Sequence, residues 1–201
     1  MAGDAAYKLM TVEAFLDWDD GSETRYELYG GRMVAMAPAT GTHGSLQMRL
    51  GGRMDLALAV RRPCRVIGEA GIARNLDTSD YYVADIAATC APDRRGGRIT
   101  EDPFLIAEVL SDSTETKVRT VKLAAYRRLP TVAEIVLLDS RRPFAEVHRR
   151  IPGDLWVVDL VIGLEGVLTL ESVPLSLPLG KLWEGLDLGD VEEDAPADQP
   201  A

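Results

Sequence analysis

The feature that most constrains the fold is a run of seven residues from Phe104 to Leu110, which contains six apolar side chains and one glutamate. A nearly continuous apolar run of this length is typical of a strand that is buried on both faces of a sheet. The chain has 201 residues, of which 46% are hydrophobic, so it is long enough to bury such a strand in one domain.

Stretches with strand or helix character surround this run. Gly30 and Gly31 separate two β-rich stretches and predict a tight hairpin. Strands are expected at 25–29, 32–36, 64–73, 82–89, 132–138, 143–150, 155–160 and 167–170, and helices at 12–18, 42–60 and 115–129. The last helix separates two strands in a way that suits one crossover connection. We therefore predict the α/β (α+β) class, with a single domain in which one mixed β-sheet packs against two or three helices.

The charge of the chain is concentrated at its end, where the last fifteen residues hold six acidic side chains and no basic one. We expect the domain to span residues 1–186 and an acidic, disordered tail to span 187–201. The formal net charge is −10, of which −4 belongs to residues 1–186. This balance excludes a generally basic nucleic-acid-binding surface and leaves short arginine clusters, which an ordinary solvated surface also carries.

The sequence carries no sign of membrane insertion. No apolar run is long enough to span a bilayer, and the first ten residues lack the pattern of a secretory signal, so a cytoplasmic protein without membrane contact is expected. Cys64 and Cys90 lie far apart in the sequence and outside any CxxC pattern. We therefore expect neither a disulfide framework nor a thiolate zinc site, and we predict that both cysteines are small buried side chains.

Two carboxylates interrupt apolar strands. Glu108 shares a strand face with Ile106 and Leu110, so burial would require it to be paired, protonated or bound to a metal. At a sheet edge it would instead reach water. Asp85 breaks the 82–89 strand in the same way, although alone it would be an ordinary solvated residue. Together the two residues are a better signal for a metal site than either is alone.

Two basic side chains are candidates for the same region. The apolar stripe of the 115–129 helix consists of Val118, Val121, Ala125 and Leu129. Lys122 falls within this stripe, so it points either toward the carboxylates or along the core with its ammonium in solvent. His43 faces the sheet side at the start of the first long helix, where a purely structural hydrogen bond is the alternative.

The donor types favour one kind of chemistry. Acidic oxygens on neighbouring strands, with no cysteine and few histidines nearby, form a hard-ligand site that suits Mg²⁺ or Mn²⁺ better than zinc or copper. The matching reaction is phosphodiester hydrolysis, in which an ammonium beside the cation neutralises charge that develops at phosphorus. The sequence contains no Gly-x-Ser-x-Gly elbow and no phosphate-cradling glycine loop, so a nucleophilic triad and a P-loop have little support.

Several motifs follow one another in a recognisable order. They are Met10–Leu16 (MTVEAFL), Arg25–Val34 (RYELYGGRMV), His43, Val83–Ile86 (VADI), Ala107–Thr114 (AEVLSDST) and Lys122–Tyr126 (KLAAY). In this order the chain resembles the Uma-two family of restriction-endonuclease-like proteins, which lies within the PD-(D/E)XK nuclease superfamily. The resemblance covers roughly residues 8–160.

The resemblance implies a restriction-endonuclease-like fold in which Asp85 and Glu108 bind the metal, Mg²⁺ or Mn²⁺. Nucleases of this superfamily carry a lysine two residues after the strand glutamate, and here Leu110 stands at that position. The resemblance implies that Lys122, on the following helix, takes the place of the missing lysine.

The same resemblance adds two residues to the site. Glu27, in the Tyr-Glu-Leu motif, becomes a third metal ligand, although by itself it would be interpreted as a surface strand residue. His43 matches a histidine that the family carries at the start of its first long helix. Both residues are therefore expected among the catalytic group.

The resulting hypothesis is a Mg²⁺-dependent endonuclease that hydrolyses DNA and forms a homodimer, a state common among nucleases that cut both strands. DNA contacts are expected in the loop between the two carboxylate strands, at Arg94, Arg95 and Arg98. The alternative is a catalytically inactive binding or assembly module with the nuclease fold. It is consistent with the negative charge and with Ala84 and Asp112, which stand where the family usually has proline.

Overall fold

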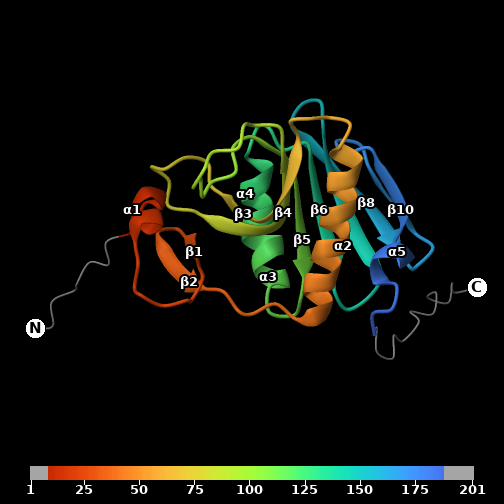
Figure 1. Cartoon of the computed structure of the whole chain (residues 1–201), viewed down its shortest axis with the longest axis horizontal. Helices are drawn as coiled ribbons and strands as arrows, with labels where there is room; N and C mark the ends of the chain where they lie inside the picture. The colour runs from red at the N-terminus through yellow and green to blue at the C-terminus, as the bar shows by residue number, and fades with distance from the viewer. Residues whose placement is uncertain (1–8, 188–201) are drawn as a thin grey trace, which may run out of the picture.

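The computed structural model describes residues 9–187, whose centre is a six-stranded mixed sheet (Figure 1). Its strands, in spatial order, are β3 (Arg65–Ile72), β4 (Tyr82–Thr89), β5 (Pro103–Leu110), β6 (Glu134–Asp139), β7 (Phe144–Ile151) and β8 (Leu155–Ile162). β5 and β6 pair in parallel, and the other neighbouring pairs are antiparallel. The predicted mixed sheet with one helical crossover is therefore confirmed. The acidic residues 188–201 of the expected tail lie outside the described part of the chain.

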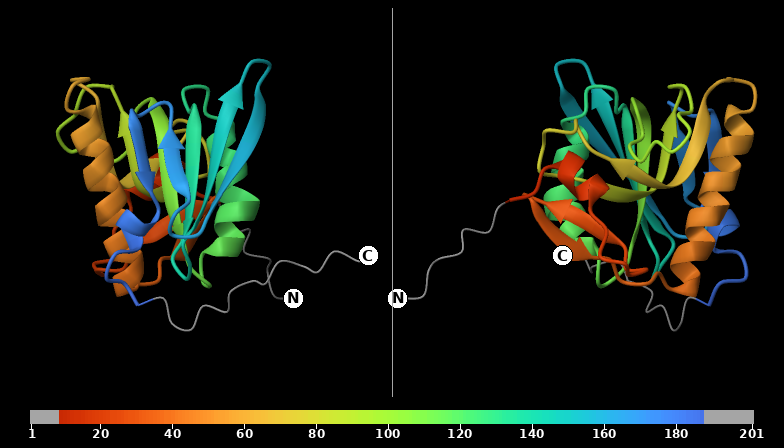
Figure 2. Two further views of the ribbon diagram at one scale, coloured as in Figure 1. Left: turned by 90° about the vertical axis from the view of Figure 1, so that its right-hand side faces the viewer. Right: turned by 60° about the vertical axis from the view of Figure 1, so that its left-hand side comes forward.

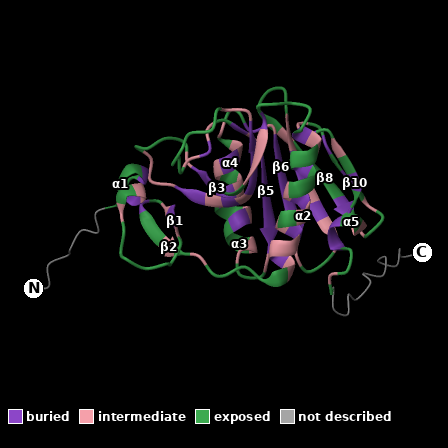
Figure 3. Ribbon diagram, viewed as in Figure 1, coloured by how far each residue is buried: buried purple, intermediate pink, exposed green. Residues whose placement is uncertain are grey.

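Helices cover both faces of the sheet (Figure 2). On one face lies α2 (Gly41–Leu58), which buries Leu46, Leu50, Met54 and Leu58 at a spacing of four residues. On the other face lies the crossover helix, made of α3 (Glu115–Lys117), η1 (Val118–Lys122) and α4 (Leu123–Arg127). Because β5 and β6 are covered on both sides, they are the most buried strands (Figure 3).

The crossover helix is not a uniform α-helix. Its middle segment, η1, is a π-helical turn, whose wider spacing shifts the phase of the residues that follow. The buried positions are therefore Val118, Lys122 and Tyr126. Val121, which α-helical periodicity places in the apolar stripe, is 38% exposed, so that part of the prediction is wrong.

A small lobe lies at one end of the sheet, beside β3 and β4 (Figure 1). It consists of α1 (Val12–Asp17) and the hairpin of β1 (Tyr26–Tyr29) and β2 (Arg32–Ala35), which pair antiparallel as predicted. Gly31 has a φ of +78°, and a Cβ there would lie 2.7 Å from the Cβ of Leu9, so the turn requires glycine. Leu28 joins the lobe to the main sheet through two backbone hydrogen bonds with Tyr81, of 2.8 and 2.9 Å.

The end of the described chain forms a second small sheet. β9 (Val167–Leu170) matches the predicted strand, whereas β10 (Leu175–Pro178) and α5 (Gly180–Trp183) were not expected. Their apolar side chains complete the core layer beneath α2. The buried carboxylate of Glu134 accepts hydrogen bonds from the backbone amides of Glu171 and Ser172 and so fastens this segment to β6.

Cys64 and Cys90 form a disulfide bond, which corrects the expectation of two separate thiols. The pairing follows from the strand register. Arg65 lies opposite Thr89 in the β3–β4 pair, so the cysteines occupy the next pair of positions along the hairpin. The two cysteines are 26 positions apart in the sequence, so their spacing alone did not indicate a contact. They lie together because β3 and β4 are antiparallel, which places the start of β3 beside the end of β4.

Candidate active site

The predicted site residues lie where β4 and β5 separate. The ladder between these strands continues as far as the pair Ile86 and Ala107. One residue further, the carboxylate Oδ2 of Asp85 accepts a hydrogen bond of 2.7 Å from the backbone N–H of Val109. The Asp85 side chain thus replaces a backbone acceptor, and this bond holds the carboxylate close to the Glu108 segment.

The alternation of β4 changes at Asp85. Strict alternation predicts Ala84 and Ile86 on one face, but Ala84 packs with the crossover-helix side and Ile86 with the α2 side. Opposite Asp85, Glu69 of β3 has a φ of +54°, so the neighbouring strand is irregular at the same level. This local bend explains why periodicity alone misplaces the second half of the strand.

Glu108 is 3% exposed and lies inside the protein. Its Oε1 accepts hydrogen bonds from the hydroxyl of Tyr126 at 2.5 Å and from Nζ of Lys122 at 3.2 Å. Its Oε2 accepts none from residues 9–187. Burial raises the pKa of Glu108 to about 7, with a further contribution from the charge of Asp85, although Lys122 acts in the opposite direction.

Lys122 connects two strands of different sheets. Its Nζ lies 2.8 Å from Oε1 of Glu27 and 3.2 Å from Oε1 of Glu108, and it donates a 2.9 Å hydrogen bond to the carbonyl of Val83. Burial opposes its charge, but the two carboxylates raise the pKa of Lys122 above its ordinary value, so it stays an ammonium ion. The inward orientation expected from the helix is present.

Glu27 approaches Lys122 from the small lobe. Its Oε1 also accepts a 2.8 Å hydrogen bond from the N–H of Val83, and its Oε2 accepts one of 2.7 Å from the hydroxyl of Tyr29. Both oxygens are therefore engaged within the protein. Burial and the adjacent Glu27 raise the pKa of Tyr29, which keeps this hydroxyl a donor.

His43 lies in the first turn of α2, where its N–H is capped by the hydroxyl of Thr40. Its Nε2 is 3.1 Å from Oδ1 of Asp85, and this hydrogen bond raises the pKa of His43 while burial opposes the shift. One turn later, Gln47 donates from Nε2 to the carbonyl of Asp85 at 2.8 Å and to Glu69 at 3.1 Å. Sequence reasoning missed Gln47, although its position four residues after His43 places it on the same helix face.

The three predicted metal ligands do not converge on one point. Within residues 9–187, no three His, Cys, Asp or Glu side chains form a group that could hold a metal ion, because Glu27 pairs with Lys122. Asp85 and Glu108 remain as a pair of hard donors, and Oε2 of Glu108 has no other partner among these residues. Mg²⁺ is commonly held by one or two carboxylates with water and substrate oxygens, so this pair fits such a cation.

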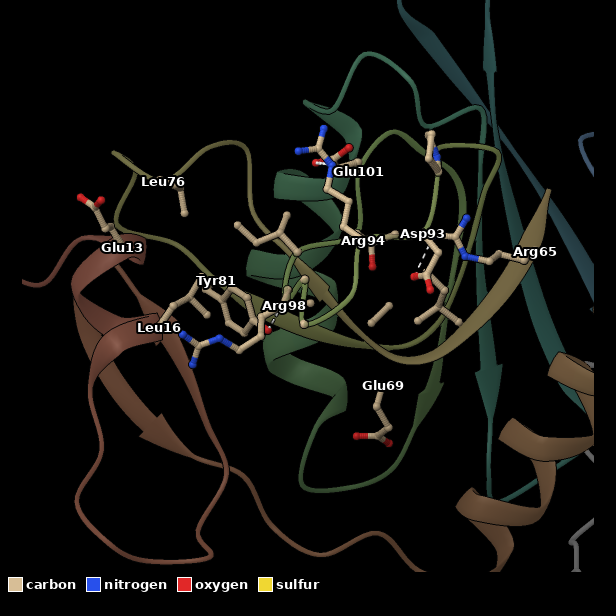
Figure 4. A pocket seen from close by; sticks show the side chains of 18 of the residues that line it. Glu13, Leu16, Arg65, Glu69, Leu76, Tyr81, Asp93, Arg94, Arg98 and Glu101 are labelled. Carbon is tan, nitrogen blue, oxygen red and sulfur yellow. Dashed lines mark hydrogen bonds and ion pairs between the residues drawn. The ribbon is translucent and has the colours of Figure 1, made fainter. Parts of the chain in front are cut away.

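The three predicted DNA-contact arginines lie in the loop between β4 and β5, apart from the carboxylates. Arg94 and Arg98 line a pocket of about 670 Å³ along β3 (Figure 4). Arg94 forms an ion pair of 3.0 Å with Glu101, Arg98 lies 3.7 Å from Asp17, and Arg95 is exposed. Glu69 lines the same pocket, so its contact with Gln47 links the pocket to Asp85.

Comparison with known proteins agrees with the family resemblance found in the sequence. A family model named Uma2 and described as "Putative restriction endonuclease" matches residues 12–180. The chain belongs to the Uma2 family. The matched segment contains Glu27, His43, Asp85, Glu108 and Lys122.

Two relatives come from Synechocystis sp. strain PCC 6803. The uncharacterized protein slr1290 is 26% identical over 90% of this chain and 95% of its own length, and the uncharacterized protein sll1609 is 21% identical over 79% and 91%. A crystal structure of "a putative nuclease belonging to DUF820" from Anabaena variabilis ATCC 29413 shares the fold, with a TM-score of 0.70 at 18% identity. The alignment covers 87% of this chain and 97% of that one. In residues 9–187, helices of the length and apolar character that a membrane crossing requires are absent.

Proposed function

We propose that this member of the Uma2 family is a Mg²⁺- or Mn²⁺-dependent endonuclease that hydrolyses phosphodiester bonds of DNA. The observation that carries the proposal is a buried ammonium ion, that of Lys122, held against Glu108 beside a second carboxylate, Asp85. Placing a buried carboxylate, a half-buried one and a buried lysine close together is costly for stability, and such a group is typical of a functional site. The family description and the fold of the Anabaena protein support the same reaction class.

Asp85 and Glu108 are the residues that would hold the cation. When bound, the cation supplies Lewis-acid polarisation of a phosphoryl oxygen and lowers the pKa of the attacking water. Lys122 places a fixed positive charge beside the reacting phosphate and stabilises the negative charge that develops in the transition state. Glu27 and the carbonyl of Val83 hold the ammonium in place.

His43 and Gln47 position Asp85. His43 contacts Oδ1, Gln47 contacts the backbone carbonyl, and the N–H of Val109 contacts Oδ2. The carboxylate therefore has little freedom to rotate, which favours a prearranged site. On this basis His43 is proposed as a positioning residue for the metal-binding carboxylate.

Metal binding tests the site directly. Asp85→Asn keeps the size of the side chain and removes its charge, so titration calorimetry with Mn²⁺ should show at least a tenfold loss of affinity relative to the parent. The matched control is Asp55→Asn, an exposed aspartate on α2, which should bind as the parent does. Equal Mn²⁺ affinity for Asp85→Asn and the parent would remove Asp85 from the site.

Lys122→Met tests the chemical step. The change keeps the apolar stem and removes the ammonium, so single-turnover DNA cleavage should fall by about a hundredfold or more with little change in DNA affinity. Because two buried carboxylates lose their partner, thermal unfolding must first show that the variant is folded at the assay temperature. Lys117→Met, on the exposed side of the same helix, is the control.

The outcome separates an enzyme from a catalytically inactive module. Cleavage by the parent with Mg²⁺ or Mn²⁺, lost in Lys122→Met and kept in Lys117→Met, supports the enzyme. If the parent cleaves neither supercoiled, linear nor single-stranded DNA with either cation, the binding or assembly module is the better description.

A further inference from the structure

β8 is an edge strand with the composition of a central strand. It ends the six-stranded sheet, so one of its sides has no strand partner within residues 9–187. Seven of its eight residues are apolar, which is typical of a strand buried on both faces. Even so, Leu155, Leu160 and Ile162 are 62%, 60% and 70% exposed.

The exposed apolar surface is concentrated on this edge. Of fifteen exposed large hydrophobic residues in the described part of the chain, eight lie between residues 151 and 167. Val158, Leu160 and Ile162 alternate on the crossover-helix face, and Leu155 and Val157 lie on the other face. In the left view of Figure 2, β8 stands at the side of the sheet opposite α2. A concentration of this kind marks an interaction surface rather than scattered surface residues.

β8 lacks the features that usually keep edge strands from pairing. Its eight residues include no lysine, proline or glycine. Its one charged residue, Asp159, is already ion-paired with Arg149 of β7. The backbone groups along the free side are therefore accessible to another strand, and few charges oppose its approach.

The rest of this sequence does not supply a cover. Residues 188–201 contain five acidic residues and two large apolar ones, and residues 1–8 contain two large apolar ones. Neither segment matches an eight-residue apolar edge. An occupant with a matching apolar strand is therefore a better fit than either segment.

Charge and symmetry favour a second copy as that occupant. The chain carries a net charge of −10, so two copies repel each other except where their surfaces are nearly neutral, as β8 is. Two copies of an edge strand pair antiparallel about a twofold axis normal to the sheet. This axis brings together residues of the same face, so Val158, Leu160 and Ile162 meet the same three residues of the second copy.

We propose that two copies of this chain dimerise by antiparallel pairing of their β8 strands, which joins the two six-stranded sheets into one. Backbone hydrogen bonds give the contact its direction, and the apolar side chains on both faces are removed from water. The proposal is independent of nuclease activity, because neither β8 nor its apolar faces include a residue of the metal site.

The oligomeric state tests the proposal. Light scattering after size-exclusion chromatography should give the parent a mass of twice 21.9 kDa at about 50 μM chain. The double variant Leu160→Lys/Ile162→Lys should elute with the mass of one chain, because four lysines would meet across the axis. The matched control, Met48→Lys/Leu56→Lys, changes two α2 residues that are each 76% exposed and should stay dimeric.

A second measurement uses the parent alone and does not depend on variant folding. In hydrogen–deuterium exchange, amides of residues 155–162 should be protected at high concentration and lose protection on dilution to monomer. A monomeric parent, a dimeric Leu160→Lys/Ile162→Lys variant, or exchange in β8 that is the same at both concentrations would each overturn the proposal.

Discussion

The burial of Glu108 has a consequence for stability that depends on pH. Its pKa is about 7 in the folded protein and near 4.5 in the unfolded chain. The folded state therefore holds this proton more tightly. The resulting stabilisation is complete below about pH 4.5 and is lost as the pH rises through about 7, with a total of about 3 kcal/mol.

This effect is measurable by urea unfolding between pH 5 and 8 with a chelator present. Relative to Glu108→Gln, the free energy of unfolding of the parent should decrease as the pH increases. The exposed residue Glu23 provides the control, since Glu23→Gln should follow the parent at every pH. A constant difference between the parent and Glu108→Gln across this range would contradict the assignment of a raised pKa to Glu108.

Single-residue patterns predicted part of the site. Glu108 and Lys122 were located because a charge at an apolar position of a strand or a helix conflicts with its neighbours. Tyr126 and Gln47 escaped prediction because a tyrosine or glutamine on a helix conflicts with nothing. Their importance comes from tertiary partners, Glu108 and Asp85, which lie 18 and 38 residues away in the sequence.

The β3–β4 hairpin is closed by the disulfide between Cys64 and Cys90, which joins residues 26 positions apart. A link over a loop of this length reduces the entropy of the unfolded chain, and its removal should lower the free energy of unfolding by about 3 kcal/mol. Guanidinium unfolding with and without reductant measures the loss. Cys64→Ser/Cys90→Ser should match the reduced parent and be insensitive to reductant, and an unchanged midpoint for the reduced parent would argue against the bond.

Elements with a strong period or a clear stop were predicted well. α2 has its cap at Thr40 and four evenly spaced core residues, and the β1–β2 turn has two glycines with positive φ. The π-helical turn was not predicted, since it depends on how the crossover helix packs over β4 and β5. β10 and α5 are too short to show a clear period, and their apolar residues are buried only because they pack into the core beneath α2.

At the scale of the whole molecule, DNA binding should depend on the loop between β4 and β5. The ion pairs of Arg94 and Arg98 are exposed and hence weak, so phosphates can compete for these side chains. Arg94→Ala/Arg95→Ala/Arg98→Ala should weaken DNA binding and flatten its salt dependence without changing Mn²⁺ affinity.

Fluorescence anisotropy over a range of salt concentrations provides the measurement. The control Arg32→Ala/Arg53→Ala/Lys181→Ala removes three exposed positive charges elsewhere and should have the smaller effect. If both triple variants lose affinity equally, the binding reflects total charge and the loop has no special role.

The sheet was predictable as a class but not in its order. The apolar run in β5 and the helix that follows it indicate a parallel pair inside a mixed sheet. That β8 lies at an edge cannot be inferred from its sequence, because Leu155–Ile162 has the composition of a central strand. The discrepancy between composition and position is itself the basis for the proposed dimer.

The lobe that supplies Glu27 packs Val12, Phe15 and Leu28 against Tyr81 in a small core that is separate from the two larger ones, and its backbone hydrogen bonds to the main body all go to residues 76–81, just before β4. It should therefore open as a separate cooperative unit, at a lower free energy than global unfolding. Native-state hydrogen exchange should show amides of Tyr26–Tyr29 exchanging at least tenfold faster than those of β5, and equal rates would show one cooperative unit. Opening would deprive Lys122 of one of its two carboxylate partners while the sheet stays folded, so the fraction of molecules with a complete site is set by the local folding equilibrium of this lobe.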